Sequence, residues 1–154
     1  MTIKEFTLKV ICPILFCAIV FQALVETVSE AAGTVSISET TFTNPKRIIF
    51  KWISDATGEA SAITTSSYSG HLVQTTITNG TGANQPTDLY DIVLYDSNTS
   101  EELLGGAGLD NSTSVVSRTI SDASLGWVVE SKLIMSVQNA GPVKSGTVII
   151  YISP

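Results

Sequence analysis

Charged residues are scarce in this 154-residue sequence, and no part of it is strongly basic. Asp, Glu, Lys and Arg together make up 14% of the chain, where about a quarter is usual. The formal net charge is -6 at pH 7, and Lys46-Arg47 is the only adjacent basic pair. Because phosphate contacts need clusters of Lys and Arg, we expect no nucleic-acid partner.

Cysteine and histidine are almost absent as well. The two cysteines, Cys12 and Cys17, both fall in an apolar block near the N-terminus. On a helix they would point in different directions, so we expect no disulfide between them. His71 is the only histidine, whereas a metal site built on His or Cys needs several such residues. We therefore predict no metal site and no cofactor.

Catalytic motifs are missing too. A Ser-His-Asp hydrolase would have to use His71, yet no Gly-x-Ser-x-Gly motif is present, and a turn or core histidine is the favoured interpretation. The carboxylates of residues 88–96 do not match a helix-loop calcium motif. A loop calcium site of Asp96, Asn98 and Glu101 is the alternative to solvated turn carboxylates, which we favour. We predict no catalytic residues.

Glycine-rich and asparagine-rich turns give weaker signals. Residues 105–108, Gly-Gly-Ala-Gly, lack the Lys and the following helix of a phosphate-binding loop, so we expect a flexible turn. Asn79, Asn98 and Asn111 each begin an Asn-x-Ser/Thr triplet. These triplets would matter as glycosylation acceptors only in a eukaryotic secretory host.

The longest apolar stretch is Val10 to Val25, interrupted only by Gln22. It is short for a membrane span, which needs about 20 apolar residues, and its basic start also fits a signal peptide. Signal peptide, membrane anchor and a helix packed inside an oligomer all remain open. We predict a hydrophobic helix over residues 1–31 and a separate domain over residues 32–154, with membrane contact through Val10 to Val25 as one alternative.

The second domain is rich in Ser, Thr, Val and Ile and shows the two-residue periodicity of strands. We expect about eight short strands separated by turns, which indicates an all-β fold, an antiparallel β-sandwich of Ig-like or jelly-roll-like type. The expected segments are 34–40, 47–53, 59–66, 71–78, 86–96, 101–104, 115–120, 127–137 and 147–152.

Three of these segments predict which side chains form the core. The clearest, 86–96, places Tyr90, Ile92 and Leu94 on one face, and 47–53 does the same with Ile48, Phe50 and Trp52. In 71–78 Val73 and Ile77 are expected in phase. In 127–137 the expected core residues begin with Trp127 and Val129. Segment 147–152 is apolar on both faces and should lie centrally in its sheet.

Six stretches form a recognisable set in order and spacing: 52–58, 68–70, 86–96, 103–108, 137–141 and 145–152. Together they resemble a family of small β-rich phage and prophage structural proteins. Two features differ from that family: residues 96–101 replace a typical Asp-Gly turn, and the apolar N-terminus is additional. The resemblance implies a virion component rather than an enzyme.

From these observations we expect a non-enzymatic structural subunit, a homo-oligomer or a partner of other structural subunits. Its place would be the virion, the cell surface or the extracellular space. The alternative is a tethered or secreted β-sandwich that binds carbohydrate or another surface. Exposed Trp127 and Tyr68 would favour that alternative. A third hypothesis, an enzyme, requires His71 in a cleft beside a carboxylate.

Overall fold

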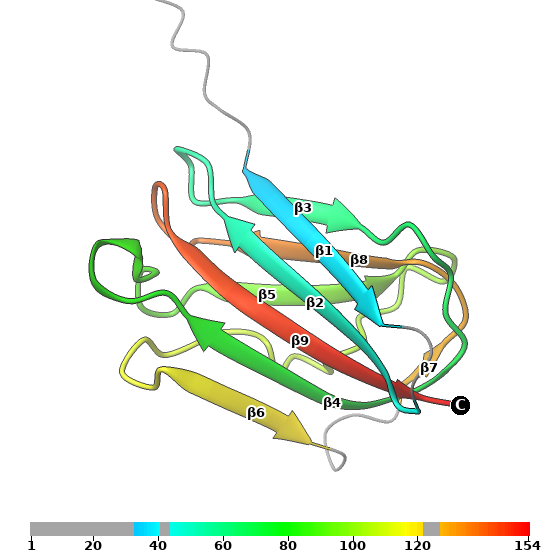
Figure 1. Cartoon of the computed structure of the whole chain (residues 1–154). Helices are drawn as coiled ribbons and strands as arrows, with labels where there is room; N and C mark the ends of the chain where they lie inside the picture. Colours follow the sequence, from blue (N-terminus) through cyan, green and yellow to red (C-terminus); the bar gives the residue numbers. More distant parts are fainter. Residues whose placement is uncertain (1–32, 41–43, 122–126) are drawn as a thin grey trace, which may run out of the picture.

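The computed structural model describes residues 33–40, 44–121 and 127–154, which form nine strands and one 3-10 turn (Figure 1). The strands are β1 (Thr34–Thr40), β2 (Lys46–Ile53), β3 (Ala60–Ile63), β4 (Gly70–Asn79), β5 (Asp91–Asp96), β6 (Ser117–Ser121), β7 (Val128–Val129), β8 (Leu133–Gln138) and β9 (Ser145–Ser153), and the turn η1 is Gly82–Asn84.

The strands make two sheets in which every pairing is antiparallel. Sheet A has the order β1-β2-β9-β4-β6, and sheet B has the order β3-β8-β5. The short β7 pairs with the start of β4, on the same side of β4 as β6. The all-β prediction is therefore confirmed, and the arrangement is consistent with a β-sandwich.

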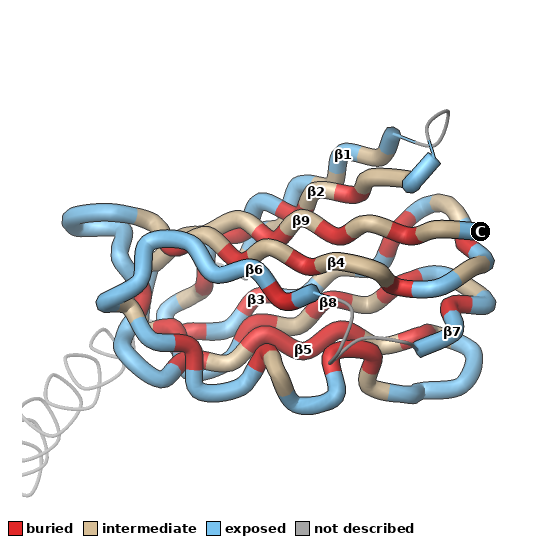
Figure 2. Tube along the Cα trace, turned by 90° about the horizontal axis from the view of Figure 1, so that it is seen from below, coloured by how far each residue is buried: buried red, intermediate tan, exposed pale blue. Residues whose placement is uncertain are grey.

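The core lies between the two sheets and consists of the side chains that alternate inward along each strand (Figure 2). The predicted inward residues Ile48, Phe50 and Trp52 are 0–1% exposed, as are Tyr90, Ile92 and Leu94 in their own segment. Trp52 packs over Gly146 so closely that a Cβ there would lie 2.6 Å from Cζ2 of the indole. The facing elements thus bury the largest side chains of the domain.

The expected strand 86–96 is half right. Strand β5 begins only at Asp91 and lies at the edge of sheet B, because the preceding residues leave the ladder. The backbone N–H of Thr87 donates to the carbonyl of Ala140, and Leu89 turns the chain with a φ of 64°.

The expectation for 147–152 is confirmed, since β9 lies at the centre of sheet A.

The long strand expected over 127–137 is wrong, because the chain changes sheets within it. Strand β7 belongs to sheet A and β8 to sheet B, with a bend at residues 130–132 between them. Backbone N–H groups of that bend donate to the carboxylate of Asp96 instead of to a neighbouring strand. Trp127 is 38% exposed rather than part of the core, whereas Val129 is buried.

Two smaller expectations also need correction. The register of β4 against β9 shifts between Leu72 and Gln74, so Val73 leaves the core phase and Leu72 joins Ile77 inside. Residues 101–104 form a turn with an isolated bridge at Glu102 rather than a strand. This turn still contributes to the core, because its two leucines are 0% exposed.

The helix predicted over residues 1–31, with its apolar stretch Val10 to Val25, lies outside the described residues. In the part of the chain that is described, no helix has the length and apolar character needed to cross a membrane.

Candidate functional site: the outer face and free edges of sheet A

The side of sheet A that faces away from sheet B has an unusual composition, and we call it the outer face. Its small side chains are nearly all Ser or Thr, and its few large ones come from the central strands. Its residues are Thr34, Ser36, Ser38, Thr40, Arg47, Ile49, Lys51, Ile53, His71, Gln74, Thr76, Thr78, Ser117, Thr119, Ser121, Val128, Ser145, Thr147, Ile149, Tyr151 and Ser153.

Strand register sets these side chains in rows across the sheet. One row runs from Ser38 through the half-buried Ile49 and Ile149 to Thr76 and Thr119. The hydroxyls of Thr76 and Thr119 are 3.4 Å apart, within reach of a hydrogen bond. In the next row the hydroxyls of Thr78 and Ser117 are 3.2 Å apart. Such cross-strand hydroxyl pairs give a low, even surface with an apolar centre.

The outer face also differs in charge from the protein as a whole. It has the cations Arg47 and Lys51 and none of the carboxylates of the described residues, although the net charge is -6. The carboxylates lie on β5, in the connecting loops and on the core side of β1 at Glu39. A neutral to basic face on an acidic protein favours contact with an acidic or uncharged partner.

A shallow depression of about 440 Å³ lies at one end of the outer face. It forms beside the last residues of β2, where Gly146 occupies a core-facing position of β9 and has no side chain. On the outward side its lining combines hydroxyls, one ammonium group and one aliphatic side chain, and the inward-facing Val35, Trp52 and Gly146 complete it. The outward residues that line it are Thr34, Ser36, Lys51, Ile53, Ser145 and Thr147.

The two edges of sheet A are open within the described residues. Strand β1 pairs only with β2, and β6 pairs only with β4. Neither strand contains Lys or Pro, but each has one charged residue on its core side, Glu39 on β1 and Arg118 on β6, and such inward charges oppose pairing unless the partner provides the opposite charge. Each edge therefore presents backbone N–H and C=O groups that a further strand could pair with.

The outer edge of β5, by contrast, is covered by the segment 102–111. The N–H of Leu103 donates to Leu94, and the N–H of Ile92 donates to Gly108. Gly108 lies so close that a Cβ would be 2.1 Å from the carbonyl oxygen of Ile92. The chain thus protects one edge of sheet B, while both edges of sheet A stay open in the described residues.

Asp96, one of the carboxylates considered for calcium, is instead a buried acceptor. Its Oδ1 accepts from the N–H groups of Asn98 and Thr99 and from the Ser131 hydroxyl, and its Oδ2 accepts from the N–H groups of Glu130 and Ser131. Burial alone would raise its pKa, but these hydrogen bonds outweigh that effect and lower it to about 2. The expectation of a solvated carboxylate is therefore wrong here.

The burial of Asp96 also removes the central ligand of the alternative calcium site. Asp96 is 0% exposed and has donors on both oxygens, while the side chain of Glu101 is exposed. No group of three or more His, Cys, Asp or Glu side chains that could hold a metal ion occurs among the described residues.

His71 lies near the start of β4 with an exposed side chain, opposite Val128 on one side and Ser153 on the other. Within the described residues its imidazole has no hydrogen-bond partner. The cleft beside a carboxylate that the enzyme hypothesis requires is therefore not formed around His71 by the described residues.

In two of the three Asn-x-Ser/Thr triplets, the asparagine side chain is buried and forms hydrogen bonds within the protein. Asn79 is 8% exposed, accepts from the hydroxyl of Tyr90 and donates to the carbonyls of Ser112 and Val115. Asn111 is 2% exposed and donates to backbone carbonyls. Neither side chain is available for glycan attachment, and the Asn98 amide nitrogen remains the accessible one.

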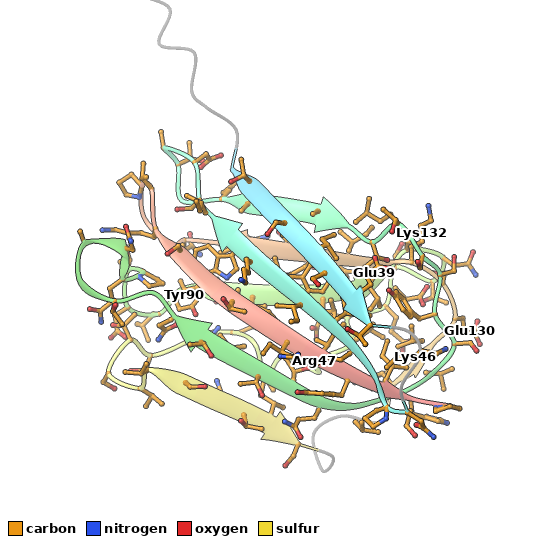
Figure 3. The ribbon with its side chains drawn as sticks, viewed as in Figure 1. Glu39, Lys46, Arg47, Tyr90, Glu130 and Lys132 are labelled. Carbon is orange, nitrogen blue, oxygen red and sulfur yellow. The ribbon has the colours of Figure 1, made fainter. Side chains whose placement is uncertain are left out.

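The two aromatic residues proposed for surface recognition differ in exposure. Tyr68 is 2% exposed, and burial raises the pKa of its phenol, whereas Trp127 is 38% exposed. They therefore do not form a shared aromatic surface. Tyr90 lies at the opposite end of the sandwich from Glu130 (Figure 3) and is buried against Trp52, with ring centroids 5.7 Å apart.

Comparison with known proteins adds no relative to this geometry: no protein-family model, no curated protein and no solved structure matches the chain.

Proposed function

We propose that this protein is a non-enzymatic structural subunit of a virion or of an extracellular filament or surface assembly. The observation that carries the proposal is the pair of open edges of sheet A, β1 and β6. Unpaired backbone N–H and C=O groups at an edge can pair with a strand of another chain, and the covered edge of β5 is the contrasting case within the same molecule.

Three sequence features support this proposal. The resemblance to small phage structural proteins spans most of the domain from about residue 48 onward. An immunoglobulin-like or jelly-roll-like sandwich suits repeated packing, because both sheets have extended faces. A hydrophobic helix over residues 1–31 would anchor or bundle the subunits, by way of a membrane, a signal sequence retained in the product, or an oligomer interior.

Electron microscopy and sedimentation velocity of the purified full-length protein test the proposal. We expect regular oligomers or filaments whose abundance rises with protein concentration. Particles that stay monomeric at high concentration, with the N-terminal residues present, would contradict it.

A second candidate function is the binding of an acidic polysaccharide on the outer face. The depression of about 440 Å³ offers hydroxyls and the ammonium group of Lys51, and Tyr151 lies half-exposed toward the other end of the same face, opposite Arg47. Sugar hydroxyls and carboxylates match such donors, and an aromatic ring can stack on a sugar face.

Gel electrophoresis through immobilised acidic and neutral polysaccharides distinguishes the two functions. If the second function holds, an acidic polysaccharide retards the protein, and Lys51→Glu abolishes the retardation while Lys132→Glu, an equal charge change away from this face, does not. Equal retardation of both variants would indicate a nonspecific charge effect and contradict this function.

A further inference from the structure

We propose, on the basis of the structural role above, that the partner of each open edge is a second copy of this chain shifted within the plane of sheet A. Strand β6 of one copy lies beside β1 of the next, in parallel. The two sheets A then continue into each other, and the outer faces become one surface.

The direction of the strands makes this arrangement possible. Four successive antiparallel pairings separate β1 from β6 in sheet A, so these two edge strands run in the same direction. A shift without rotation therefore brings β6 beside β1 with both core sides facing the same way. A two-fold rotation about the sheet normal would instead pair β1 with β1 or β6 with β6.

Charge distinguishes these possibilities. On the core side of its sheet, β1 has one charged residue, Glu39, and β6 has one, Arg118. In the register that places Arg118 beside Glu39, pairing β6 with β1 brings opposite charges together, whereas neither two-fold pairing can do so in any register, because each joins two copies of the same strand. Opposite charges across neighbouring strands stabilise a sheet, and like charges destabilise it.

The register that aligns these two charges also covers apolar side chains. With Arg118 beside Glu39, Val116 comes beside Ile37 and Ser117 beside Ser38. Val116 is 60% exposed, and Ile37 is only partly buried against the core. The serine pair would repeat the hydroxyl contact that Ser117 already makes with Thr78. Both edges thus lose exposed apolar area in the same register.

Open-ended growth follows from the geometry. A contact between two different edges leaves each new copy with a free edge, and its repetition as a shift without rotation gives an open array rather than a closed ring. Every copy also keeps the start of β1 at the same end of the sandwich, so the points at which residues 1–32 are attached all lie on one side of the array. A two-fold pair would place them at opposite ends.

Charge reversal tests the pairing in the full-length chain. We expect Arg118→Glu alone and Glu39→Arg alone to need about five- to tenfold more protein for half-assembly, because repulsion replaces attraction. An equimolar mixture of the two variants should assemble like the wild type, since each β1 then meets a complementary β6. Lys132→Glu and Glu101→Arg, which make matching charge changes at exposed positions off both edges, should leave the midpoint unchanged.

Disulfide trapping provides a second test that does not use Glu39→Arg. That substitution removes contacts within the subunit, because the Glu39 carboxylate accepts hydrogen bonds from the N–H and hydroxyl of Thr65. In chains with Cys12 and Cys17 replaced by Ala, we expect Ser38→Cys and Ser117→Cys proteins to form a 38–117 disulfide only when mixed. The geometry suits a disulfide, because neighbouring strands lie about 4.8 Å apart.

The outcomes separate this inference from the proposed function. A 38–117 disulfide together with rescue by mixing supports the inference. Disulfides within either single variant, or oligomers without any 38–117 disulfide, overturn the inference and leave the structural role standing. Dispersed monomers under all conditions overturn both.

Discussion

At the scale of single residues, burial of polar groups explains the largest departures from the expected pattern. Asp96 reads as a turn residue in the sequence, yet its carboxylate holds together the β5 turn and the bend between β7 and β8. Asn79 reads as half of an Asn-Gly turn, yet its amide fills a buried position. Local sequence shows the polarity of such residues but not the distant backbone groups that they bond.

We expect Asp96→Asn to lower the free energy of unfolding by about 3 kcal/mol, because an amide NH2 would face N–H donors at residues 130 and 131. Urea denaturation followed by tryptophan fluorescence measures the change. Asp110→Asn, at an exposed turn carboxylate, is the control and should change stability by less than about 0.5 kcal/mol.

Acid should act through the same carboxylate. Its folded pKa, about 2, lies below the ordinary 3.8, so its stabilising contribution is fully present above about pH 4 and is lost as the pH falls toward 2. The Asp96→Asn variant should therefore lose less stability than the wild type between pH 4 and 2. An equal loss in both proteins would contradict this assignment.

Tyr90→Phe should cost about 1–2 kcal/mol, because the buried carbonyl oxygen of Asn79 would lose its donor while the apolar packing against Trp52 remains. Thermal unfolding monitored by circular dichroism checks the value. Tyr95→Phe, at a half-exposed position on β5, should unfold at nearly the wild-type temperature.

At the scale of elements, alternation predicted the strands that follow a regular ladder and failed where tertiary contacts interrupt one. Segments 34–40 and 47–53 alternate without interruption, and both are strands. The run 127–137 alternates just as regularly but divides between two sheets, because Asp96 provides acceptors for the bend. A bulge in β4 likewise shifts Val73 out of phase.

The segment 102–111 shows how one element controls an edge. We expect Gly108→Ala to destabilise the domain by about 3 kcal/mol, because its Cβ would overlap the carbonyl of Ile92 and displace the cover of β5. Gly82→Ala is the matched control. It has open space, and its positive φ alone should cost about 1 kcal/mol.

Hydrogen exchange reports the second part of this prediction. The N–H groups of Ile92 and Leu103 hold segment 102–111 against β5. They should exchange faster in Gly108→Ala than in Gly82→Ala, even when the two variants are compared under conditions that give them equal free energies of unfolding. Unchanged protection at both positions would show that the segment does not depend on Gly108.

At the scale of the whole molecule, the carboxylates are separated from the outer face, although the sequence shows only a net charge. Period-two alternation in β1 and β6 could have revealed the Ser/Thr-rich part of this face, because the outward residues of each strand, all Ser or Thr, share one phase. Alternation could not show that β1 and β6 are the edge strands of sheet A, because strand order depends on pairings between residues far apart in the chain.

The acidic charge of the molecule predicts how assembly responds to pH. We expect the assembled fraction to rise between pH 7 and pH 5, because the net charge of -6 and the repulsion it causes both decrease. Glu39 should remain ionised there: burial would raise its pKa, but hydrogen bonds, including those from Thr65, lower it overall.

Sedimentation velocity at constant ionic strength measures this response. In Arg118→Glu the rise should be weaker, because lower repulsion cannot replace the missing opposite charge. An assembled fraction that falls toward pH 5 in the wild type would contradict the expectation.

Gly33 and the C-terminal end of β9 lie at opposite ends of the sandwich (Figure 1), as the register of Thr34 with Ile53 and of Lys46 with Ile152 requires. A cargo fused after Pro154 would accordingly be displayed at the pole remote from the attachment of residues 1–32. In a translational array all such cargoes would form a single layer, which makes the C-terminus the natural position for a fluorescent or affinity label.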